Sequence, residues 1–205
     1  MSYEEWKNAK SESQSITAGV QRAKEYKQSY VNEYKNPKGL GANSDTFGIV
    51  APHDPPKHID TIDFNNPDAV KSILNSYENR ARSLDHETAC VITTEGKVYE
   101  CYGIKDRVWV DADLGDELKG AIVSHNHHID VTEFSLGSDD MSLFASYELK
   151  ELHGCDEKYT HILSRINKTL DPLPEDWMNV ENYQHATVVM WAERYGYGYV
   201  RVQND

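Results

Sequence analysis

The sequence predicts an α/β (mixed α+β) fold in which a mixed central sheet is flanked by helices. Segments with the 3.6-residue period of amphipathic helices alternate along the chain with short runs typical of β-strands. This interleaving favours a sheet covered by helices. Hydrophobic residues make up 39% of the 205 residues, which is enough for a core, and the length suits one domain with an appendage or two very small domains.

Residues 1–58 are predicted to form a polar helical arm followed by a linker. Residues 3–34 carry few apolar side chains, although the late tyrosines lie at the i, i+4 spacing of one helical face. A polar helix needs a partner, so we expect the arm to pack on the domain or on another subunit, or to stay partly disordered. Residues 36–58 contain Pro and Gly and form the predicted linker, which leaves 59–205 as the globular domain.

The first half of the predicted domain contains a helix and a β-hairpin. Asn66 followed by Pro67 predicts a helix start, because Asn is a good cap and Pro is favoured at the first helical position. The Glu95-Gly96 pair predicts the turn of the hairpin. The expected elements are, in order, a helix over 66–83, strands over 88–94 and 97–102, a short strand over 107–110, and a solvated acidic loop over 111–117.

The second half of the domain begins with a short apolar run of the buried-strand type, over 120–124. Helix and strand patterns then alternate to the end of the sequence. The expected elements are a helix over 138–152 stopped by His153-Gly154, a strand over 158–165, a loop over 171–174, a helix over 175–195 closed by Gly196, and a strand over 197–202.

The composition argues against several classes of function. The formal net charge of −13 disfavours a protein that coats nucleic acid, because phosphate binding needs a basic surface. No apolar run approaches membrane-spanning length, and the N-terminus is polar rather than signal-like. Cys90, Cys101 and Cys155 show no CxxC spacing, so we expect reduced thiols in a cytoplasmic protein.

The most informative segment is Ser124-His125-Asn126-His127-His128, which follows the predicted buried strand. Histidines at i and i+2 of an extended segment point to the same side. Asp140, or its neighbour Asp139, lies at the start of the next predicted helix, and a carboxylate there would complete a set of two histidines and one carboxylate. Such a set leaves a fourth position open, which is typical of catalytic zinc. The alternative is a polar loop whose histidines face solvent.

Other histidines and aromatic residues are expected to have structural roles. His128 is an alternative ligand for which a solvent-facing position is favoured, and the same holds for Asp130. The run Tyr195–Tyr199 favours core packing over a binding surface. We expect each of the scattered histidines to be structural: His53, His58, His86, His153, His161 and His185.

These residues together resemble the JAMM (MPN-plus, or JAB) metallopeptidase family. The shared order is a helix, Glu87 at a strand start, a turn, and then strand–His–x–His–loop–Asp–helix, over about residues 60–165. The His125-Asn126-His127 sequence is closest to the prokaryotic and phage RadC-like and tail-assembly-like branches. The resemblance implies a JAMM/MPN-like (cytidine-deaminase-like) core and a zinc ion held by His125, His127 and Asp140. It also implies that Glu87 is the general base.

Two departures from the family pattern lie in the loop after the histidines. His128 stands where the family has proline, and Gly137 stands where it has serine. That serine stabilises the tetrahedral intermediate in the family, and loss of one such donor typically costs about 10²–10³ in rate. Ser135 and Ser138 flank the gap, and either would supply the hydroxyl if the loop is shifted. Ser138 is also the predicted N-cap of the following helix.

The function that the sequence favours is a zinc-dependent metallohydrolase of JAMM type, which cleaves a peptide or isopeptide bond in a protein or peptide substrate. One alternative is a catalytically weak MPN-like assembly or binding module, consistent with Gly137 and with an arm that would bind a partner or a second copy. The other is a RadC-like protein linked to DNA metabolism, which the acidic charge disfavours. A phage or mobile-element association would place the protein in the host cytoplasm or in the virion.

Overall fold

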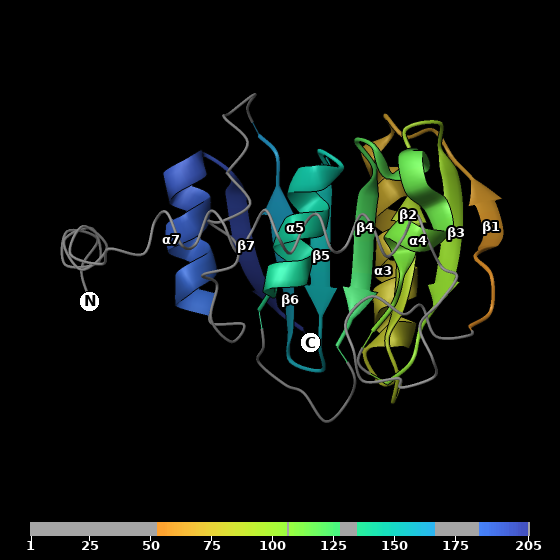
Figure 1. The fold of residues 1–205 in the computed structure, drawn as a ribbon, viewed down its shortest axis with the longest axis horizontal. Coiled ribbons are helices and arrows are strands. Elements are labelled where there is room, and N and C mark those ends of the chain that lie inside the picture. The colour runs from red at the N-terminus through yellow and green to blue at the C-terminus, as the bar shows by residue number, and fades with distance from the viewer. Residues whose placement is uncertain (1–52, 106, 128–134, 167–184, 205) are drawn as a thin grey trace, which may run out of the picture. The chain divides into compact units, whose positions relative to one another are not determined.

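The computed structural model describes residues 53–105, 107–127, 135–166 and 185–204 (Figure 1). The predicted arm helix and the predicted loop over 171–174 lie outside the described residues. Within the described part of the chain, no helix is both long enough and apolar enough to cross a membrane.

Seven strands of the described residues form one mixed sheet in the order β1-β3-β2-β4-β5-β6-β7 (Figure 1). Their bounds are β1 Lys57–Thr61, β2 Thr88–Ile92, β3 Lys97–Tyr102, β4 Ile122–Asn126, β5 Glu151–Cys155, β6 Tyr159–Ser164 and β7 Gly198–Gln203. Neighbouring strands are antiparallel except for β4 and β5, which are parallel. Every residue of the central strand β4 is buried. The predicted mixed sheet with interleaved helices is therefore confirmed.

The helices cover the two faces of this sheet. One face carries α3 (Pro67–Ala81), and the other carries α4 (Val110–Leu114) and α5 (Ser138–Ser146), as Figure 1 shows. Alternation along β4 separates the two faces, because Ser124 bonds to a residue of α3 whereas His125 lies beside a residue of α5. We call them the α3 face and the α5 face. Near β7, the last helix, α7 (His185–Tyr195), packs its Trp191 against Tyr197.

Helix α3 forms as the sequence predicts. The Asn66 side chain accepts hydrogen bonds from the backbone N–H groups of Asp68 and Ala69, at 3.1 and 3.3 Å, and so caps the helix. Its apolar stripe is buried against the sheet, and together they form the core of the α3 face. The buried members of this core are Val70, Leu74, Tyr77, Ala81, Cys90, Ile92, Val98 and Ile122.

The predicted hairpin of β2 and β3 is also confirmed. Gly96 takes a positive φ of 82° at the turn, a conformation that favours glycine. A Cβ at this position would lie 1.9 Å from the backbone oxygen of Ile62, so a larger residue also lacks space. The carbonyl of Gly96 accepts a hydrogen bond from the N–H of Ile62 at 2.9 Å, which fixes the chain after β1 to the turn.

The strand predicted over 107–110 and the acidic loop predicted over 111–117 are both wrong. The structure has an isolated bridge between Ile104 and Arg107, then α4, and then a 3₁₀ helix, η1 (Gly115–Leu118). Both edges of β3 are occupied, by β1 and β2, so this segment cannot pair with β3 as a further strand. Its apolar residues Trp109 and Val110 are buried at the start of the short helix instead.

The helix predicted over 138–152 is too long. Helix α5 ends at Ser146, Glu148 reverses the chain with a positive φ of 50°, and β5 begins at Glu151. His153 and Gly154, which were expected to stop the helix, lie inside β5. The apolar residues of this stretch are spaced as in a helix, which is why a helix was predicted. In the structure, Leu152 is buried in β5 instead, because this strand pairs in parallel with β4.

Strand β1 was not predicted, and it begins at Lys57, within the predicted linker. β6 and β7 lie at the predicted strands. Helix α7 is described from His185 and ends before Gly196, which has a positive φ of 71° as a helix stop requires. The three cysteines are free thiols and are buried.

A buried ionic network connects α3 to the middle of the sheet. One carboxylate oxygen of Glu78 accepts hydrogen bonds from Ser124 Oγ at 3.0 Å and from His153 Nδ1 at 2.8 Å. The second ring nitrogen of His153 lies 3.2 Å from the carboxylate of Glu151. Burial lowers the pKa of His153, but the hydrogen bonds to Glu151 and Glu78 outweigh burial and raise this pKa to about 9. His153 is therefore an imidazolium at neutral pH.

This network predicts a pH-dependent contribution to stability. The folded pKa of His153 is above its unfolded value of about 6.5, so the contribution is fully present below about pH 6.5 and is lost as the pH rises through 9. Between about pH 6.5 and about pH 8.5 we expect a loss of about 2 kcal/mol in the free energy of unfolding. Urea denaturation of the wild type and of a Glu78→Leu, His153→Leu double variant measures it.

The double variant is the reference because His125 and His161 have lowered pKa values and therefore titrate in the opposite sense. The wild type should lose stability relative to this variant as the pH rises. A difference between the two proteins that stays constant over this range would show that His153 is not a stabilised cation.

Candidate metal centre

Strand β4 directs His125 and His127 to the α5 face of the sheet. His127 directly follows the strand, and its backbone N–H donates to the Cys155 carbonyl of β5 at 2.8 Å, so strand-like pairing extends to this residue. The two imidazole rings lie edge to face with their centroids 5.1 Å apart. Both side chains are buried. The i, i+2 spacing therefore brings the two rings together, as strand geometry predicts.

Small residues on the neighbouring strands make room for these rings. His125 is paired with Ala89 of β2 on one side and with Gly154 of β5 on the other. A Cβ at Gly154 would lie 3.5 Å from Cε1 of each histidine and 2.9 Å from Cδ2 of Leu136. The space above Gly154 is thus filled by both rings and by Leu136, which places Leu136 beside the two histidines.

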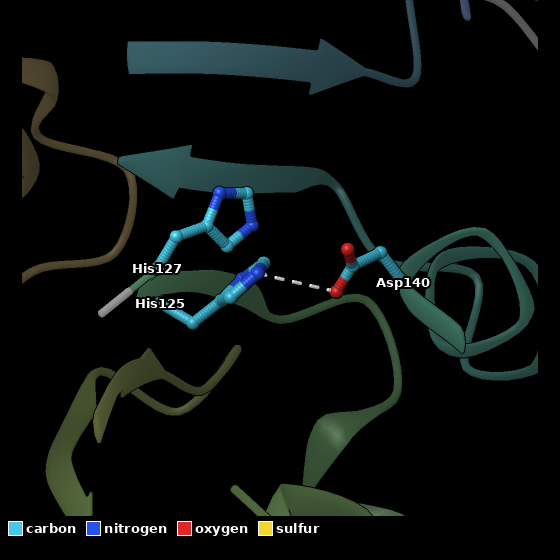
Figure 2. A group of neighbouring side chains, drawn as sticks. All are labelled: His125, His127 and Asp140. Atoms are coloured by element: carbon cyan, nitrogen blue, oxygen red, sulfur yellow. Dashed lines mark ion pairs between the residues drawn. The ribbon is translucent and has the colours of Figure 1, made fainter. Parts of the chain in front are cut away.

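Asp140 reaches the histidines from the first turn of α5 (Figure 2). Its Oδ1 lies 3.3 Å from His125 Nε2, and its Oδ2 accepts a hydrogen bond from the backbone N–H of Gly137 at 2.8 Å. Gly137 is the N-cap and Ser138 is the first helical residue, so the prediction of Ser138 as the cap is wrong by one position. The backbone of Gly137 is extended, so its N–H points to the carboxylate of Asp140. This N–H has no partner within the helix, and the carboxylate supplies one.

The structure separates the two neighbouring aspartates. Successive helical residues point about 100° apart, so only one of them can face the histidines. Asp139 is 63% exposed and accepts a hydrogen bond from Arg107 at 3.2 Å. His125, His127 and Asp140 each offer a ligand atom, and these atoms all lie within 4.8 Å of one another. Two imidazole nitrogens and one carboxylate oxygen at this spacing fit the donor set of zinc.

Burial controls the charge of these groups. Desolvation lowers the pKa of His125 to about 4, and a hydrogen bond to the backbone of His153 opposes this shift. The imidazole is therefore neutral at pH 7, the form that binds metal ions. A ring hydrogen bond to the backbone also fixes the orientation of a metal-binding histidine. Burial raises the pKa of Asp140, an effect opposed by the charge of His127 and by the N–H of Gly137.

Glu87 lies immediately before β2, two residues ahead of Ala89, the partner of His125. Alternation continued back from Ala89 assigns Glu87 to the α5 face, the face of the two histidines. Its backbone is hydrogen-bonded to Ile104 and Gly103 at 2.8 and 3.0 Å. Glu87 is not part of the group whose ligand atoms lie within 4.8 Å of one another, and it is half-buried.

Asn126, between the two histidines, fixes the chain on both sides of Glu87. On the α3 face its Oδ1 accepts from the backbone N–H and from the hydroxyl of Thr88, both at 2.8 Å. Its Nδ2 donates to the His86 carbonyl at 2.9 Å. The residue that separates the histidines in sequence thus holds the segment that carries Glu87. This role of Asn126 depends on the pairing of β2 with β4, so it has no local signal in the sequence.

Ser135 is buried, but its hydroxyl is bound to a distant strand. Its Oγ lies 2.6 Å from Tyr199 Oη of β7. Of Ser138, the structure describes the backbone at the start of α5 and not the side chain. The structure thus brings together His125, His127 and Asp140, places Glu87 on the same face, and binds Ser135 to Tyr199.

Two histidines that the sequence analysis considered structural lie in the same region. His161 of β6 is on the α5 face, in register with Gly154, and is fully buried. Burial, together with the charge of His127, lowers its pKa to about 3. Its Nδ1 lies 2.8 Å from Tyr199 Oη, and His185 Nδ1 lies 3.1 Å from the same hydroxyl. The sequence carries no local signal for this group, because the pairing of β6 with β7 and the position of α7 assemble it.

No protein-family model matches this sequence, and the searches of curated proteins and of solved structures find no significant match.

Proposed function

We propose that the protein is a zinc-dependent hydrolase of JAMM type that cleaves a peptide or isopeptide bond in a protein or peptide substrate. The observation that supports this proposal is the group of His125, His127 and Asp140, whose ligand atoms lie within 4.8 Å of one another. The histidines are fixed on a central strand and the carboxylate on a helix start. Such rigid elements suit a site whose geometry must be maintained.

His125, His127 and Asp140 would hold the zinc ion. Three protein ligands leave a fourth position for water or substrate, which is typical of catalytic zinc. When bound, zinc supplies Lewis-acid chemistry, since it polarises a carbonyl group and lowers the pKa of water to about 7. The neutral imidazole of His125 and its hydrogen bond to the backbone of His153 favour this use of the residue.

Glu87 would act as the general base and then as the acid that returns a proton to the leaving amine. Its position in the chain assigns it to the same sheet face as the histidines but outside the ligand group. A proton carrier must be near the metal without being a ligand, so that its carboxylate can accept a proton. The hydrogen bonds of Asn126 to both neighbours of Glu87 fix its backbone. Ser138 or Ser135 would supply the hydroxyl that stabilises the oxyanion, and Ser135 would first have to release Tyr199.

Glu87→Gln is expected to abolish hydrolysis while zinc content and folding stay nearly unchanged. Gln keeps the size of the side chain but cannot accept a proton, so the loss should appear in turnover alone. We would measure cleavage of fluorogenic peptide libraries and of an ε-linked lysine isopeptide by the full-length chain, together with zinc content and melting temperature.

Glu95→Gln is a suitable control, because Glu95 is 71% exposed in the hairpin turn. A structural role for Glu87 predicts a different pattern. Loss of one polar contact would lower the melting temperature by several degrees, on the order of 1 kcal/mol, and leave turnover unchanged. That pattern would remove Glu87 from the mechanism.

A second candidate function is a catalytically weak MPN-like assembly or binding module. The hydrogen bond of Ser135 to Tyr199, together with Gly137 at the position where the family has serine, favours this candidate. Stoichiometric zinc without hydrolysis of any probe would support it over the hydrolase.

A further inference from the structure

The hydroxyl of Tyr199 connects three residues that are far apart in the sequence. Its Oη lies 2.6 Å from Ser135 Oγ, 2.8 Å from His161 Nδ1 and 3.1 Å from His185 Nδ1. The ring of Tyr199 is also stacked with that of His161, at an interplanar angle of 18°. Strand β7 and two imidazoles thus fix the position of this hydroxyl beside Ser135.

Ser135 begins a short segment that continues directly to the metal centre. Leu136, the next residue, is fully buried, and its Cδ2 lies over Gly154 beside both metal-binding histidines. Gly137 follows, and its N–H donates to Asp140 Oδ2 at 2.8 Å. This hydrogen bond orients the carboxylate so that its other oxygen lies 3.3 Å from His125 Nε2. Three consecutive residues therefore connect Tyr199 to the carboxylate ligand.

We propose that Tyr199 is a positioning residue for the metal centre, which acts by holding Ser135 and thereby fixing the Gly137 N–H and the Asp140 carboxylate. This inference rests on the proposed function only in taking Asp140 as a metal ligand. Tyr199 does not bind the ion itself. Its phenol ring can pack without the hydroxyl, so the hydroxyl has a role separable from the role of the ring.

Tyr199→Phe is expected to weaken zinc binding of the full-length chain by up to about 10-fold. This is the lower end of the effect of losing a direct partner of a metal ligand, because Tyr199 acts on Asp140 through Ser135 and Gly137. Zinc affinity would be measured by competition with a chromophoric chelator, and the melting temperature would be recorded in parallel. Tyr99→Phe is the matched control. Tyr99 lies on the distant strand β3, and its hydroxyl donates a hydrogen bond to Glu117. The control should bind zinc as the wild type does.

A double-mutant cycle identifies the route of the effect. Ser135→Ala should weaken zinc binding by a factor similar to that of Tyr199→Phe, and the double variant should bind no more weakly than either single variant. Equal affinity of Tyr199→Phe and wild type would overturn the proposal. So would two effects that multiply in the double variant, because Tyr199 would then act by another route.

Amide hydrogen exchange at Gly137, followed by NMR in zinc-free protein, separates this proposal from the proposed function. The Gly137 N–H should exchange faster in Tyr199→Phe than in the wild type, whereas amides of β2 should be unaffected. Wild-type protein that binds no zinc would refute the proposed function, and the exchange rate would still decide the role of Tyr199. An unchanged rate at Gly137 would show that the segment is fixed without Tyr199.

Discussion

Asp140→Asn is expected to release zinc from the protein, whereas Asp139→Asn is expected to retain it. The amide of Asn carries no charge and is a much weaker ligand for zinc than a carboxylate. A carboxylate oxygen of Asp140 lies in the ligand group, while the Asp139 carboxylate is exposed and bound to Arg107. Elemental analysis of the purified proteins measures the result, and the wild type should contain one zinc ion per chain.

The His125→Ala, His127→Ala double variant provides the reference for a protein without the site. If it carries as much zinc as the wild type, the metal binds elsewhere. Asp139→Asn should affect only the helix start and the Arg107 pair, by about 0.3–1 kcal/mol. Zinc loss from Asp139→Asn alone would make Asp139 the ligand and would place Leu136, not Gly137, three residues before the ligand.

Glu78→Leu is expected to destabilise the protein by about 3–5 kcal/mol, the largest effect on stability that we predict. Glu78 accepts hydrogen bonds from Ser124 and His153 in the core, so its removal leaves a buried imidazolium with the carboxylate of Glu151 alone. Urea denaturation near neutral pH, where His153 is protonated, measures the loss.

The Glu78→Leu, His153→Leu double variant should recover much of this loss. Apolar replacement of both members of a buried ion pair is often close to neutral, whereas removal of one member leaves a charge without compensation. Glu95→Leu is the surface control. Its pair with Lys97 is exposed, so the change should cost less than about 1 kcal/mol. Equal effects of Glu78→Leu and Glu95→Leu would contradict the role of the buried network.

Local sequence patterns were sufficient for the elements whose stability depends on neighbouring residues. The Asn66-Pro67 cap and the turn at Gly96 formed as predicted, because capping and positive φ are properties of a few adjacent residues. The same holds for the close approach of His125 and His127, which follows from alternation along one strand.

Patterns over longer stretches were ambiguous, and long-range pairing decided them. Leu149 and Leu152 fit a continuation of helix α5, yet the chain turns at Glu148 and pairs with β4. The segment over 107–110 had the composition of a strand, but β1 already occupies the outer edge of β3. Burial stabilises an apolar residue in either conformation, so propensity alone cannot choose between them.

The mixed α/β fold, the histidine pair on a buried strand and a carboxylate at the next helix start could all be predicted from local patterns. The tertiary structure decided that Asp140 rather than Asp139 faces the histidines, because the helix fixes which of two adjacent side chains points inward. It also placed Tyr199, Ser135 and His161 in one hydrogen-bonded group. These residues are far apart along the chain. The pairing of β6 with β7 brings His161 to Tyr199, and the segment before α5 brings Ser135 to the same hydroxyl.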